Sequence, residues 1–121
     1  MEQSFYKQDS PVVIPAADGK YIAEHFGRAS FGGPGLSVAR MIAPPGWSEP
    51  FQNPEFDEYT LMVRGKKEIH VGEEKVILSA GESLFIPRGS RVGWPQPLAE
   101  PAETSTVCVP AFSPGLAHRE K

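Results

Sequence analysis

The chain has 121 residues, a formal net charge of −3 at pH 7 and a hydrophobic fraction of 40%. This length fits one domain, and the slightly acidic balance excludes the basic surface that nucleic-acid binding needs. No segment approaches the ~18 apolar residues of a membrane-spanning helix, and the first residues lack the basic and apolar pattern of a secretion signal. We therefore expect a cytoplasmic protein that binds neither nucleic acid nor a membrane.

A single cysteine, Cys108, excludes an intrachain disulfide and a zinc site built from several cysteines. It lies in the apolar run 107–109, so we expect a buried, inert thiol. Lysines and arginines occur in short groups, such as Lys66 and Lys67, which we expect to lie on a solvated surface.

Glycine and proline punctuate short apolar runs along the whole chain, with 12 and 13 copies respectively. This pattern is typical of an all-β domain with many turns. Residues 12–14 predict an edge strand, residues 16–26 a helical turn or an irregular loop, and residues 32–35 a turn.

The strand signals become clear after residue 35, with a loop or short strand at 47–56 and a polar tail at 113–121. Strands are predicted at residues 36–43, 58–63, 67–71, 75–78, 83–86, 91–94 and 104–109. Seven or eight closely spaced strands without a long amphipathic helix predict a sandwich or a barrel, because each sheet must bury one face. Strand alternation places Glu58 and Met62 on one face and Tyr59 on the other.

Two glycine-bracketed segments carry a recognisable spacing. In the first, Gly46 and Gly65 bracket Glu58, with six residues between Glu58 and Gly65. In the second, Gly81 is followed after five residues by Pro-Arg-Gly at 87–89. These segments resemble the paired motifs of the cupin superfamily.

The resemblance implies a single-domain, all-β, cupin-type jelly-roll β-barrel at residues 36–112. An N-terminal arm with an edge strand at 1–35 would precede the barrel, and a C-terminal tail at 113–121 would follow it. Within the superfamily, residues 56–59, 62–65 and 80–90 resemble the ethanolamine-utilisation protein Q type, which is also histidine-poor in this pocket.

In the cupin family, three histidines and one glutamate hold a divalent metal. Here the two histidine positions of the first motif fall on Phe51 and Asn53, or on Gln52 and Pro54 when the gap is one residue shorter. The third falls on Val92, so that Glu58 is the retained ligand. We therefore predict no metal site and no cofactor, because one carboxylate and one amide make a poor transition-metal site.

Glu58 is the candidate catalytic residue, because the motif and strand alternation both direct it into the barrel. Burial raises the pKa of a carboxyl group, which suits a general acid or base near neutral pH. The alternative is a glutamate that only bonds to the backbone or to Arg91. We expect Glu49, Phe51, Asn53 and Trp94 to line the ligand pocket.

Three functions remain open. The first is a metal-independent cupin that binds a small polar metabolite and performs acid–base chemistry through Glu58. The second is a non-catalytic binding or sensing module, and the third is a metalloenzyme with the oxygen ligands Glu49, Asn53 and Glu58. We expect a homodimer in each case, because small barrels have exposed edge strands to cover.

Overall fold

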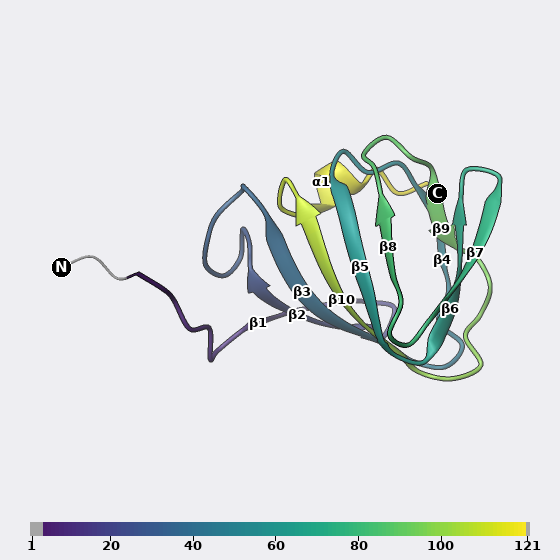
Figure 1. Cartoon of the computed structure of the whole chain (residues 1–121), viewed down its shortest axis with the longest axis horizontal. Helices are drawn as coiled ribbons and strands as arrows, with labels where there is room; N and C mark the ends of the chain where they lie inside the picture. The colour runs from purple at the N-terminus through teal and green to yellow at the C-terminus, as the bar shows by residue number, and fades with distance from the viewer. Residues whose placement is uncertain (1–3, 121) are drawn as a thin grey trace.

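The computed structural model describes residues 4–120, which form ten short strands and one helical turn (Figure 1). The elements are β1 (Val12–Ile14), β2 (Tyr21–Phe26), β3 (Ser37–Ala43), β4 (Glu49–Gln52), β5 (Asp57–Arg64), β6 (Lys66–Val71), β7 (Glu74–Ser79), β8 (Ser83–Ile86), β9 (Val92–Trp94), β10 (Ala102–Val109) and α1 (Pro114–Ala117). No helix in this part of the chain has the length and apolar character needed to cross a membrane.

The strands form two sheets whose paired strands all run antiparallel. One has six strands in the order β1-β2-β3-β10-β5-β8, and the other has four in the order β4-β9-β6-β7. This arrangement confirms the predicted all-β jelly-roll barrel. Strand β1 pairs with β2, and β2 pairs with β3, so residues 12–14 and 21–26 belong to the larger sheet.

The packed part of the interior is built where inward-facing residues of both sheets meet. Met62 on β5, Ile69 on β6 and Val92 on β9 are fully buried, together with the rings of Trp47 and Trp94. Alternation along β5 is as predicted, because even-numbered residues from Glu58 to Met62 are buried while Tyr59 is half-exposed. Val92 stands where the family motif has its third histidine, and in this chain it is a core residue.

Gly65 forms the corner at which the chain passes from β5 in one sheet to β6 in the other. Its φ is +82°, and a Cβ added to it would lie 2.5 Å from the carbonyl oxygen of Pro101. Only glycine is compatible with both the positive φ and this close approach. The corner sets the register of β6, in which Lys67 and Ile69 face inward.

An irregularity in β4 changes which of its residues face inward. Glu49 pairs with Trp94 and Gln52 pairs with Val92, with a register shift between them. Both Glu49 and Gln52 are buried although they are three residues apart, which regular alternation would forbid. Phe51 packs instead beside Gly93, where an added Cβ would lie 3.0 Å from the phenyl ring.

Three sequence expectations need correction. Residues 21–26 are the strand β2 rather than a helical turn or a loop, because they pair with β1 and β3 through a bulge near Glu24 that breaks simple alternation. The C-terminal segment is more than a polar tail, since it contains α1, capped by Ser113, and Arg119 forms a bridge with Gln52. Lys67 is buried rather than solvated.

Candidate functional site

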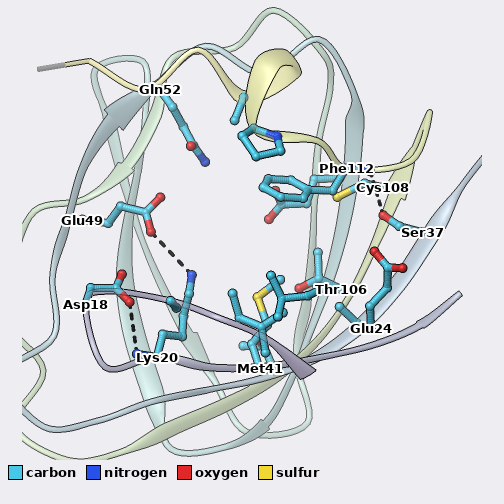
Figure 2. A pocket seen from close by; sticks show the side chains of 18 of the residues that line it. Asp18, Lys20, Glu24, Ser37, Met41, Glu49, Gln52, Thr106, Cys108 and Phe112 are labelled. Carbon is cyan, nitrogen blue, oxygen red and sulfur yellow. Dashed lines mark hydrogen bonds and ion pairs between the residues drawn. The ribbon is translucent and has the colours of Figure 1, made fainter. Parts of the chain in front are cut away.

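A cavity of about 530 Å³ lies between the two sheets and is lined by residues of both. Its charged lining residues are Asp18, Lys20, Glu24, Glu49, Glu58, Lys67 and Arg119. Figure 2 shows Asp18, Lys20 and Glu49 on one side of the hollow, across from Thr106 and Cys108. The cavity is therefore a charged chamber with apolar walls, and its volume suits a small-molecule ligand.

Glu58 enters the cavity from β5 in the six-stranded sheet and is buried. Its carboxylate accepts a hydrogen bond of 2.8 Å from the hydroxyl of Thr60. Burial raises the pKa of Glu58, while the Thr60 hydrogen bond and the charges of Lys67 and Lys20 oppose this effect only in part. Glu58 is thus a carboxyl group whose proton affinity is increased where a ligand would contact it.

Lys67 enters the cavity from β6 in the opposing sheet, and its exposed fraction is 8%. Its ammonium nitrogen lies 5.3 Å from the ring centroid of Trp47 and 5.1 Å from that of Trp94. Burial lowers the pKa of Lys67 to about 8, helped by the charge of Lys20 and opposed by Glu58 and Glu49. Sequence reasoning missed this residue, although its parity with Ile69 on one strand was a usable signal.

A network of ion pairs forms another side of the cavity. Glu49 receives the ammonium of Lys20 at 3.5 Å and the guanidinium of Arg119 at 3.3 Å. Asp18 accepts hydrogen bonds of 2.8 Å from the indole of Trp47 and 3.1 Å from the backbone of Lys20. Burial alone would raise the pKa of Asp18, but these bonds and the nearby cations hold it below its usual value. Both carboxylates are therefore held by donors of neighbouring residues.

Two further groups at the cavity wall are structural. Glu24 accepts hydrogen bonds from the backbone of Ala29 at 2.9 Å and from the hydroxyl of Ser30 at 2.8 Å, which anchors the turn after β2. Cys108 is buried as predicted, and burial, assisted by the charge of Glu58, raises the pKa of its thiol to about 12. A thiol of this kind is a poor nucleophile at neutral pH.

The predicted site residues divide into two groups. Glu58, Glu49 and Trp94 line the cavity. Phe51 and Asn53 lie outside the cavity lining, because the irregularity in β4 turns them to the outer side. Phe51 stacks there beneath the guanidinium of Arg91 at 3.7 Å, and Asn53 is exposed.

Arg91 forms no hydrogen bond with Glu58. Its guanidinium instead donates a hydrogen bond of 2.8 Å to the carboxylate of Glu120. Besides Lys67, the structure adds Gln52, Asp18, Lys20 and Arg119 to the site. Arg119 comes from the far end of the chain, for which the sequence carries no signal.

The residues present do not fit the three-histidine metal site of the resembled family. Within residues 4–120, His25, His70 and His118 all lie outside the cavity lining, and no three His, Cys, Asp or Glu side chains gather as metal ligands. The alternative set of oxygen ligands also needs correction, because Asn53 is exposed and lies outside the cavity lining that holds Glu49 and Glu58.

Solved structures with a similar fold cover almost the whole chain. Streptomyces PAC13 in complex with uridine, a nucleoside dehydratase, has a TM-score of 0.75 and 16% identity, and the match covers 99% of this chain and 92% of that chain. KdgF from Halomonas sp. has a TM-score of 0.73 and 18% identity, and the match covers 95% of this chain and 100% of that chain. At these identities the likeness supports the fold alone.

A curated relative and a family profile match the sequence itself. The relative, named endoribonuclease YbeY of Myxococcus xanthus (strain DK1622), is 46% identical over 108 residues, which make up 89% of this chain. This chain spans only 37% of the relative's length. The family profile described as "Cupin domain" matches residues 39–108, more than half of the chain. With the barrel, the glycine corners and this match together, the chain belongs to the cupin family.

Proposed function

We propose that the chain is a small-molecule cupin that binds a polar metabolite in the cavity and catalyses proton transfer through Glu58. The observation that carries the proposal is the pair Glu58 and Lys67, which enter one cavity from opposing sheets. Their pKa values are shifted towards neutrality from opposite directions. Such shifts in a cavity are typical of functional groups.

The chemistry open to Glu58 is general acid–base catalysis. Its carboxylate accepts a proton from a C–H or O–H group of the ligand, and the carboxylic acid so formed returns the proton to another atom of the same molecule. The electron pair released from the broken bond forms a new double bond or stays as negative charge, which the Lys67 ammonium stabilises. Isomerisation and elimination of water both follow this scheme, and the name of the structural neighbour PAC13 describes a dehydratase.

The experiment begins with the metabolite that remains bound after gentle purification, identified by mass spectrometry of the denatured protein. The protein is then incubated with this compound in D₂O, and deuterium entering the ligand is followed by NMR. Glu58→Gln should slow exchange at least ~100-fold, the usual contribution of a general base. Glu74→Gln, which alters an exposed glutamate of β7, is the matched control and should exchange normally.

Exchange that persists in Glu58→Gln would overturn the catalytic role of Glu58. If neither wild type nor variant exchanges deuterium while both bind the compound with equal affinity, the protein is the non-catalytic binding module.

A second candidate function comes from the Myxococcus xanthus relative, whose name describes an endoribonuclease. The observation in its favour is the 46% identity, although this chain spans 37% of that protein. A fluorescently labelled single-stranded RNA tests it. Cleavage by the purified chain, lost on denaturation, would support this function, and intact RNA would count against it.

We propose in addition that two copies of the chain pair through the outer face of β5 and β8. Tyr59, Leu61, Val63 and Phe85 are half-exposed there, and the rings of Tyr59 and Phe85 lie 4.8 Å apart. A twofold pairing of antiparallel β5 strands would place this apolar face of one copy against the same face of the other.

Sedimentation velocity tests this pairing. Leu61→Arg should give monomers, because it places a charge at the centre of the face. Ile77→Arg, on the exposed side of β7 in the other sheet, is the control and should stay dimeric. A wild-type protein that sediments as a monomer at all concentrations would overturn the proposal.

Two finer assignments remain proposals. Residues 56–59, 62–65 and 80–90 support membership of the ethanolamine-utilisation protein Q type. A cytoplasmic location is the second of these proposals, and fractionation of cells expressing the chain would test it.

A further inference from the structure

Among the charged residues that line the cavity, Lys67 differs in how its charge is satisfied. Each of the others has a hydrogen bond or an ion pair: Lys20 and Arg119 with Glu49, Asp18 with Trp47, Glu24 with Ser30, and Glu58 with Thr60. Within residues 4–120, no hydrogen bond or ion pair is formed by the Lys67 ammonium. A buried cation aimed into a cavity therefore lacks an anionic partner.

The two tryptophan rings beside Lys67 compensate this burial only in part. Both centroids lie slightly more than 5 Å from the ammonium nitrogen, and a cation–π contact replaces only a fraction of the lost hydration. The indole N–H of Trp94 is also buried without an acceptor in the described part of the chain. The Lys67 ammonium therefore borders the cavity without an acceptor from the described part of the chain.

The cavity's own carboxylates do not fill this role. Glu49 from β4 is held by Lys20 and Arg119, and Glu58 from β5 is held by Thr60, with neither oxygen within 4 Å of the Lys67 nitrogen. The charged groups that face Lys67 are therefore Glu58, Glu49 and Lys20, each committed to another contact or repelling it. The Lys67 ammonium is thus open to an acceptor on the ligand.

We infer that the ligand of this cavity is a carboxylate, whose anionic group binds the Lys67 ammonium between the rings of Trp47 and Trp94. This inference rests on the proposed function and names the chemical class of its substrate. A carboxylate brings one negative charge to one unpaired ammonium, and its oxygens accept charge-assisted hydrogen bonds from that ammonium. The rest of the ligand then extends towards Glu58 on the opposing sheet, with its reacting proton at that end.

The chain contains two tryptophans, and both flank Lys67, so their indole N–H signals in a ¹H–¹⁵N spectrum report directly on this end of the cavity. The probes are benzoate and benzamide, which share size and shape but differ in charge, together with inorganic phosphate. Benzoate should shift both indole signals in a saturable manner, and benzamide should bind at least ~10-fold more weakly.

The variants separate Lys67 from its surroundings. Lys67→Gln and Lys67→Met should each weaken benzoate binding at least ~10-fold and remove the preference over benzamide. Lys67→Arg keeps the positive charge and should therefore retain part of the benzoate affinity and of the preference over benzamide. Lys66→Gln changes the exposed neighbour of Lys67 and should bind benzoate as the wild type does. Dispersed indole signals and an unchanged circular dichroism spectrum establish that each variant is folded.

Equal binding of benzoate and benzamide, or unchanged benzoate binding in Lys67→Gln and Lys67→Met, would overturn the inference. Tighter binding of phosphate than of benzoate would also overturn the inference, because the cavity would then prefer a phosphate group to a carboxylate. Failure of the catalytic proposal looks different: Glu58→Gln would then retain proton exchange while the dependence on Lys67 persists.

Discussion

The hydroxyl of Thr60 donates a hydrogen bond of 2.8 Å to the carboxylate of Glu58, and both side chains lie on the cavity face of β5. The same hydroxyl lies 3.3 Å from that of Thr106 on the neighbouring β10. This contact fixes the direction of a cavity carboxylate that forms no ion pair within residues 4–120. It also moderates the pKa of Glu58, since a bond to the charged form favours that form.

Thr60→Val should raise the pKa of Glu58 further, because it removes a hydrogen bond that lowers this pKa while the burial that raises it remains. The measurement is a ¹³C NMR titration of the side-chain carboxyl. Thr106→Val is the control, since it leaves the bond from Thr60 to Glu58 in place and should shift the titration less. A titration midpoint that falls in Thr60→Val would contradict this account.

Glu58→Gln should stabilise the protein at neutral pH relative to the wild type. The raised pKa means that the folded state holds the Glu58 proton more tightly than the unfolded state. This contribution is complete below the ordinary value of 4.5 and is lost as pH rises through the folded-state pKa. Urea unfolding between pH 4 and pH 8 should show a stability loss in the wild type that the variant lacks; parallel curves would refute the prediction.

Lys67→Met should abolish a rise in stability that the wild type shows at alkaline pH. The pKa of Lys67 is lowered to about 8 in the folded state from 10.5, so the unfolded state binds the proton more tightly between these values. Folding stability therefore increases as pH rises from 8 to 10.5, by about 3 kcal/mol at most. Urea unfolding at pH 7.5, 9 and 10 measures it, with Lys66→Met as the control that should keep the wild-type slope.

Gly65→Ala should destabilise the fold by more than about 2 kcal/mol, because the methyl group would combine a strained φ with a collision against the Pro101 carbonyl. Gly72→Ala is the matched control, with a positive φ of +60° but open space around the added Cβ. It should cost about 1 kcal/mol. Thermal unfolding compares the two, and equal losses would mean that the close approach at the corner is unimportant.

Cys108 should remain unreactive towards a thiol reagent such as 5,5′-dithiobis(2-nitrobenzoate) in the native protein at pH 8. Its thiol is buried, and its pKa is raised to about 12, so little thiolate is present. Reaction should be complete only after denaturation. Rapid modification of the native protein would indicate that the wall of the cavity next to Glu58 opens in solution.

Local patterns predicted the strands well wherever alternation and turn residues agreed. The strand 83–86 was predicted with its observed bounds, and the inward direction of Glu58 followed from alternation and motif spacing alike. Residues 21–26 were misjudged because the bulge near Glu24 and the burial of that charged residue hide the strand pattern. Pairing with β3, which lies more than ten residues further along the chain, decides their conformation.

Sequence alone determined the barrel class, the turn glycines and the place of Glu58, because these depend on residues close together in the chain. Tertiary structure decided the rest of the site. The irregularity in β4 turned Gln52 inward and Phe51 outward, and the return of the C-terminus brought Arg119 to Glu49. Packing of one sheet against the other buried Lys67 between two tryptophans, where no anionic group of residues 4–120 forms an ion pair with it. The burial of a side chain depends on residues that are distant in the sequence and close in space, and a short segment contains no information about them.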